Sequence, residues 1–174
     1  GEGKTALSLT LGARAQVLDF DNGLRTGLTL NDKFKSDRLA VDVKQFLEPD
    51  PAKAATVYNK AKAYIYDLTS AIRKGEWQFD AIIIDTLSAF AWSAVHNVMA
   101  NSGRLGKNPE IQHWGLAFTD IKNVMAVLCS LPCVVVLTAH QQVESVGQGD
   151  ERLDKYQLAI PGKNMPTEIM RLFD

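Results

Sequence analysis

Apolar residues recur every three or four positions over residues 54–72, which places them on one face of a helix. Asp50 and Pro51 precede this stretch, and they suit the N-cap and the first helical position. Gly75 follows it, and glycine commonly ends a helix. The pattern predicts a helix that begins at Asp50–Pro51 and ends at Gly75. Its apolar face comprises Ala54, Val57, Ala61, Ile65, Leu68 and Ile72.

Three short apolar runs have the length of strands: AQVLDF at 15–20, AIII at 81–84 and CVVVLT at 133–138. AIII is apolar throughout, which is typical of a strand buried on both faces of a parallel sheet, and CVVVLT is expected to be buried in the same way. A weaker pattern at 39–43 indicates a further strand.

Helical spacing is found at 4–11, 87–98 and 111–131, whereas residues 144–157 are polar and glycine-bearing and are expected to form a loop. Residues 158–160 are expected to form a short strand before the Pro161–Gly162 turn. Strands that alternate with long helices predict an α/β fold, in which a mostly parallel sheet carries helices on both faces.

Length, composition and net charge exclude some classes of protein but do not identify a function. The 174 residues suit a single domain, 46% of them are hydrophobic, and the formal net charge is −1. Such a charge provides no general attraction to nucleic acid or to an anionic membrane, so any nucleic-acid binding requires a local patch. No apolar run approaches the roughly 20 residues of a membrane span.

The opening GEGKT matches the end of the phosphate-binding pattern G-x-x-x-x-G-K-[ST]. Backbone N–H groups of such a loop cradle phosphate oxygens, and the N-terminus of the following helix favours the same anion. Lys4 would reach the phosphates of ATP, and the Thr5 hydroxyl would bind Mg²⁺. The nucleotide is expected to contact Gly1, Glu2, Gly3, Lys4, Thr5 and Ala6. The first glycine would precede Gly1, so we expect a chain truncated at its N-terminus and lacking its first strand, and also truncated at its C-terminus.

Three polar residues follow the ends of predicted strands: Asp21, Asp85 and His140. In open α/β sheets the carboxyl ends of the strands line the ligand crevice, so these side chains should lie near the nucleotide. Asp85 suits the aspartate that binds Mg²⁺, although it could also serve as the N-cap of the next helix. Asp21 could instead form an Asx turn with Asn22 and Gly23, and His140 could be a surface residue at a strand end.

The chain resembles the RecA-like ATPase core, most closely the short phage ATP-binding proteins that include single-strand-annealing and recombination ATPases. The matching stretches are GEGKTALSLTL, VLDFDNG, DAIIIDTLSAF, IQHWGLAF, VVVLTAHQQ and LAIPGKNMPTEI. The resemblance implies one ATPase domain over residues 1–174, with Lys4 and Asp85 in the Walker motifs. It implies that Asp21 orients the attacking water, with Asp19 as the alternative, and that His140 senses the γ-phosphate, with Gln141 as the alternative.

The same resemblance implies binding of single-stranded DNA, assembly into a ring or filament, and a place in the host cytoplasm as a phage or prophage protein. Loops 100–110 and 143–157 would contact the DNA, the first through Arg104 and Lys107, although both could be ordinary solvated loops. The three tryptophans are expected in the core or in subunit contacts. Two other functions stay open: a small-molecule kinase with Arg152 in its lid, and a module that binds ATP only for assembly.

Overall fold

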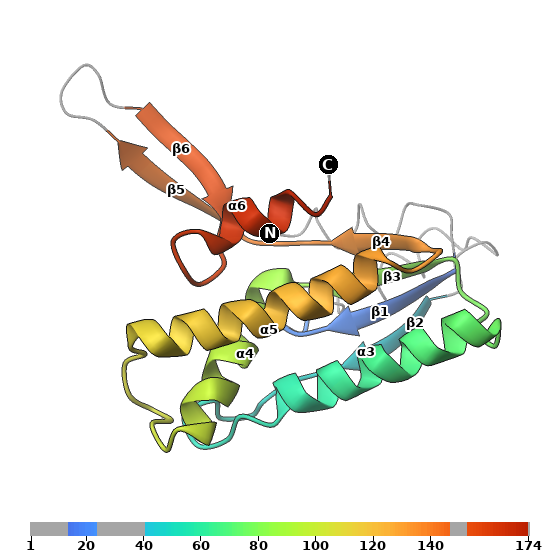
Figure 1. Ribbon diagram of the computed structural model, residues 1–174, viewed down its shortest axis with the longest axis horizontal. Coiled ribbons are helices and arrows are strands. Elements are labelled where there is room, and N and C mark those ends of the chain that lie inside the picture. The colour runs from blue at the N-terminus through green and yellow to red at the C-terminus, as the bar shows by residue number, and fades with distance from the viewer. Residues whose placement is uncertain (1–13, 24–40, 147–152, 174) are drawn as a thin grey trace.

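The computed structural model describes residues 14–23, 41–146 and 153–173 (Figure 1). Four strands form a parallel sheet in the order β2-β1-β3-β4. Uniformly buried side chains occupy the two central strands, which confirms the prediction for AIII in β3. The same prediction was wrong for β4, because β4 is an edge strand of the described sheet and Val134 is 53% exposed. The strands are β1 (Ala15–Asp19), β2 (Val41–Gln45), β3 (Ala81–Asp85) and β4 (Val134–Leu137).

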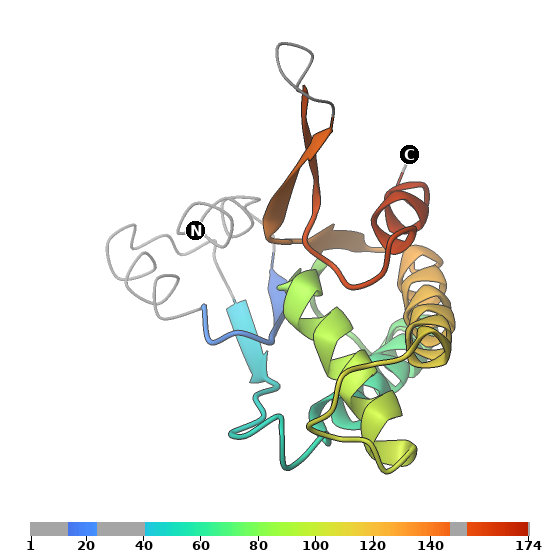
Figure 2. The same cartoon turned by 90° about the vertical axis from the view of Figure 1, so that its left-hand side faces the viewer.

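Three long helices pack on one face of this sheet (Figure 2). They are α3 (Val57–Lys74), α4 (Leu87–Asn101) and α5 (Ile111–Cys129). Their apolar faces meet Leu18, Ile82 and Ile84, because alternate residues of a strand point to the same side. Val17 and Ile83 point to the opposite side and are also buried. The helix expected at 4–11 lies outside the described residues.

The start of α3 differs from the prediction. Asp50 accepts the N–H of Ala52 in a local turn, and the helix begins only at Val57. The carboxylate of Glu48 accepts the backbone N–H groups of Thr56 and Val57 at 2.6 and 3.1 Å. A side chain from before the turn therefore caps the helix, which local sequence signals do not reveal. The predicted end is confirmed, since Gly75 has φ of +72° and closes the last turn.

The region expected as a polar loop after β4 contains an antiparallel hairpin, so that prediction was wrong. Its strands are β5 (Gln141–Val146) and β6 (Leu153–Leu158), and Val143 pairs with Tyr156. The strand predicted at 158–160 is correct only at its first residue. The hairpin projects from the rest of the molecule (Figure 2), and even Val143 and Tyr156, which share one face, are exposed.

The chain then returns to the helical layer. The Pro161–Gly162 turn has the positive φ that glycine favours, +96° at Gly162, and α6 (Met165–Met170) packs against the end of the core. Within the described part of the chain, no helix is both long and apolar enough to cross a membrane.

Candidate functional site

The carboxyl ends of β1, β3 and β4 lie at one edge of the sheet and bring three predicted residues to it. Asp19, the last residue of β1, is in register with Asp85, the last residue of β3. Asp21 follows β1 by two residues, and its Oδ2 lies 3.4 Å from Nε2 of His140, which follows β4. The convergence expected from strand ends is therefore present in the fold.

Asp85 is the buried carboxylate of this edge, with 1% of its surface exposed. The hydroxyl of Thr138, just after β4, donates to Oδ1 of Asp85. The backbone carbonyl of Asp85 accepts the N–H of Phe20 at 2.7 Å. The N-cap of α4 is the next residue, Thr86, whose hydroxyl accepts the N–H of Ala89. Asp85 is therefore not the helix cap, and its carboxylate lies at the sheet edge itself.

Asp21 forms the Asx turn that its neighbours allow. Its Oδ1 accepts the N–H of Gly23 at 3.1 Å, and Asn22 adopts the left-handed conformation with φ of +61°. The turn occupies one carboxylate oxygen, while the other faces His140. The Asx turn and a role in orienting water are thus compatible at this residue.

Asp19 is fully buried and stabilises that turn through hydrogen bonds. Its Oδ1 accepts the N–H groups of Asp21 and Gly23 at 3.3 Å each, and its Oδ2 accepts from the amide of Gln45 at 3.2 Å. Burial raises the pKa of Asp19, and these three hydrogen bonds act in the opposite direction. The contacts identify Asp19 as a residue that positions Asp21.

His140 is tied to the helical layer by its backbone. Its N–H donates to the hydroxyl of Ser88 in the first turn of α4 at 2.9 Å, while about half of its side chain is exposed. Gln141, the alternative sensor, is the first residue of β5 and pairs with Leu158. Of the two, His140 is the one that contacts Asp21.

A family model described as an AAA domain matches residues 1–174. The chain belongs to this AAA domain family. Such domains are generally ATPases that bind nucleotide, and the mostly parallel α/β sheet agrees with that assignment. No curated protein and no solved structure matches the chain. The narrower resemblance to phage recombination ATPases stays a prediction.

The phosphate-binding residues expected in this AAA domain lie outside the described residues. They are Gly1, Glu2, Gly3, Lys4, Thr5 and Ala6. Asp85 suits Mg²⁺ on its own chemistry, because this cation usually takes one or two carboxylates and completes its shell with phosphate and water oxygens. The chain therefore offers a carboxylate of the kind that an AAA domain uses for Mg²⁺.

Arg104 and Lys107, expected at a DNA-contacting loop, lie in the connection between α4 and α5. Arg104 forms an ion pair with Glu110 at 2.7 Å, and its N–H donates to Met99. Glu110 also caps α5 together with His113, which is buried. Arg104 thus holds the connection together, whereas Lys107 is exposed. Their contact with DNA stays a prediction.

Sequence reasoning missed the residues that hold the site. Ser88, Thr138 and Gln45 contact it through hydrogen bonds that join different strands and helices. Only Thr138 carried a local signal, since a hydroxyl residue at the end of a buried strand needs a hydrogen-bond partner. The partners of the other two depend on which strands become neighbours, which periodicity does not specify.

Proposed function

We propose that this AAA domain is a Mg²⁺-dependent ATPase of the RecA-like class that acts on single-stranded DNA in phage recombination, annealing or replication. One observation carries the proposal: Asp85 ends β3 beside the β1 turn, where Asp21 contacts His140. The ATPase part is also supported by the family. The DNA part is supported by the resemblance of the six sequence stretches.

Each residue has a role that follows from its place. Lys4 and the backbone of residues 1–6 bind the phosphates, and Thr5 and Asp85 hold Mg²⁺. When bound, Mg²⁺ neutralises negative charge on the phosphate oxygens. Asp85 suits this role because Thr138 and the β3 backbone fix its carboxylate in one orientation.

Asp21 and His140 act on the reacting groups. Asp21 orients a water for attack on the γ-phosphorus; the bond from that phosphorus to the bridging oxygen breaks, and ADP and phosphate leave. Asp21 Oδ2 and the imidazole lie 3.4 Å apart. When protonated, His140 can donate from one ring nitrogen to Asp21 and from the other to a γ-phosphate oxygen.

ATP turnover with and without single-stranded DNA tests the proposal. Lys4→Ala and Asp85→Asn should each lower turnover by about 100-fold or more, since they remove charge that stabilises the transition state. Asp85→Asn retains an oxygen that accepts from Thr138, so its melting temperature should stay close to that of the wild type. Lys53→Ala is the matched control, because that lysine is exposed and its one ion pair among the described residues is with Asp50.

The outcomes separate the three functions. Phosphate release that DNA stimulates supports the proposal. Turnover that requires a small-molecule acceptor identifies a kinase, and ATP binding without turnover identifies an assembly module. If Lys4→Ala and Asp85→Asn turn over ATP like the wild type, the assignment of the site is wrong.

A further inference from the structure

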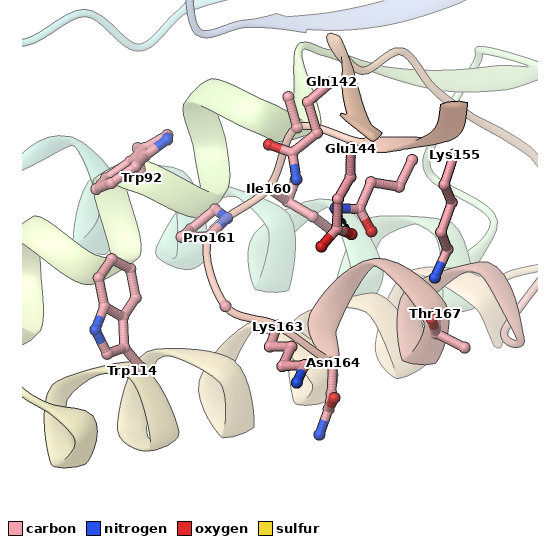
Figure 3. Close-up of a pocket in the computed structure, with 13 residues that line it drawn as sticks. Trp92, Trp114, Gln142, Glu144, Lys155, Ile160, Pro161, Lys163, Asn164 and Thr167 are labelled. Carbon is pink, nitrogen blue, oxygen red and sulfur yellow. Dashed lines mark hydrogen bonds between the residues drawn. The ribbon is translucent and has the colours of Figure 1, made fainter. Parts of the chain in front are cut away.

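A pocket of about 580 Å³ lies between the hairpin, the two helices α4 and α5, and the turn before α6, and its lining includes Gln142, two residues after His140 (Figure 3). Its volume falls in the range of small-molecule sites. Trp92 and Trp114 form one end, and Lys155 and Lys163 line the remainder with four amide or hydroxyl side chains. Those four are Gln142, Gln157, Asn164 and Thr167.

The two tryptophans are partly open to a ligand. Their rings meet edge to face with centroids 5.7 Å apart, and 43% of Trp92 is exposed. A large aromatic ring is costly to leave in water, and an exposed indole face can stack on a planar base. The exposed part of Trp92 can contact another subunit, as expected from the sequence, or a ligand in the pocket.

The charge of the pocket favours an anion. Lys155 and Lys163 are exposed, and neither forms an ion pair in residues 14–23, 41–146 and 153–173. Among the described residues that line the pocket, Glu144 is the one carboxylate, and its Oε2 lies 3.5 Å from the amide nitrogen of Gln157. The lining thus combines two available ammonium groups with a single carboxylate.

The hairpin supplies a row of polar groups on the side that faces the pocket. In the register of the hairpin, Gln142 lies opposite Gln157 and Glu144 lies opposite Lys155, so all four side chains share one face. Amide side chains both donate and accept hydrogen bonds, which suits the edge of a nucleic-acid base, where donors and acceptors lie side by side. An aromatic platform, mixed hydrogen-bonding groups and ammonium groups together match the parts of a nucleotide.

We infer that this pocket binds single-stranded nucleic acid, with one base stacked on Trp92 and neighbouring phosphates on Lys155 and Lys163. The two lysines come from β6 and from the turn before α6 and do not overlap in Figure 3, so each can contact a phosphate of its own. The inference rests on the proposed action on single strands. It keeps a contact at Lys155 within the expected loop 143–157 and replaces Arg104 and Lys107 by Trp92 and Lys163.

Fluorescence anisotropy of a labelled oligonucleotide, measured without ATP, tests the inference. Trp92→Ala should weaken binding about tenfold, and Trp92→Phe much less, because stacking on one aromatic side chain accounts for roughly 5- to 150-fold in affinity. Lys155→Ala combined with Lys163→Ala should flatten the slope of log affinity against log salt by about 1.4, at roughly 0.7 per lost phosphate contact. Lys53→Ala should bind like the wild type.

An oligonucleotide with abasic positions separates stacking from charge. It should bind the wild type several-fold more weakly than the normal strand, and Trp92→Ala should remove that difference. If a polyglutamate peptide of equal charge competes as well as the strand does, the pocket recognises acidic protein segments and the inference is wrong.

Two further results would overturn the inference and leave the ATPase proposal intact. One is unchanged binding in all pocket variants together with a loss in Lys107→Ala, which would place DNA at the α4–α5 connection. The other is no binding of any single strand by a wild-type protein that still turns over ATP. The ATPase proposal is tested separately, by whether Lys4→Ala loses ATP turnover.

Discussion

At the scale of single residues, Asp19 is held in place from several sides. Its carboxylate is fully buried and accepts three hydrogen bonds from the turn and from β2. Burial nevertheless raises the pKa of Asp19, so the ionised form is disfavoured in the folded protein. The residue therefore links the shape of the site to proton binding.

Asp19→Asn should reveal this link. A carboxyl whose pKa is raised by folding binds protons more tightly in the folded state, so the wild type loses stability as pH rises from about 4 through the raised pKa. Asparagine has no such titration, and its oxygen can still accept from Asp21 and Gly23. The unfolding free energy of Asp19→Asn, relative to the wild type, should increase with pH over that window in urea titrations. A difference that falls with pH would contradict the assignment.

His140 and Gln141 can be told apart by paired variants. His140→Ala should lower ATP turnover tenfold or more, because its imidazole contacts Asp21, whereas Gln141→Ala should have the smaller effect. Steady-state phosphate release provides the measurement, and ATP affinity should change less than turnover. The opposite ranking would make Gln141 the sensor.

Sequence alone located Asp21, Asp85 and His140, because a polar residue after an apolar run is a local signal. It could not decide between Asp21 and Asp19. Both follow the same strand, and their difference depends on Gln45 in a strand 26 positions away. Burial and hydrogen-bond partners, which only the fold specifies, assign one to positioning and leave the other facing His140.

At the scale of elements, the start of α3 depends on a contact that crosses a turn. Glu48→Ala should destabilise the protein by about 1–2 kcal/mol, since it removes the acceptor of the first helical N–H groups. Glu48→Gln keeps an acceptor oxygen and should cost less. Glu76→Ala, at an exposed position after the helix, is the control for urea unfolding. Equal stabilities of Glu48→Ala and Glu76→Ala would show that the cap contributes nothing.

The strands and long helices were predictable because burial imposes a period on their side chains. The β5–β6 hairpin was not, since both of its faces carry polar residues and it is held by backbone pairing. The strand order β2-β1-β3-β4 could not be predicted from the sequence either. It depends on which strands pair with each other, and the periodicity of apolar residues along one strand does not indicate its neighbours.

At the scale of the whole molecule, the three strand ends form one hydrogen-bonded unit. Phe20 donates to Asp85, Leu87 donates to Thr138, and Thr138 donates to Ile84, so β1, β3, β4 and the start of α4 are joined there. A ligand that binds this edge should therefore stabilise the fold as a whole and not only one loop.

Thermal unfolding with Mg²⁺ and ATP measures that coupling. Ligand at 100 times its dissociation constant adds about 2.7 kcal/mol, which corresponds to a rise in melting temperature of roughly 5–10 °C for a chain of this size. Lys4→Ala should lose most of the rise, and Lys53→Ala should keep it. An undiminished rise in Lys4→Ala would mean that ATP stabilises the protein from another site.

The position of His140 gives the hairpin a mechanical property. The N–H of His140 is fixed to Ser88 and its carbonyl accepts from Ala159, so it lies at the base of the hairpin, one residue before β5. Six residues of β5 at about 3.3 Å each make an arm of about 20 Å. A tilt of about 10° at its base would displace the far end of β5 by about 3.5 Å, so a small change of angle beside His140 becomes a displacement of several ångströms along the hairpin.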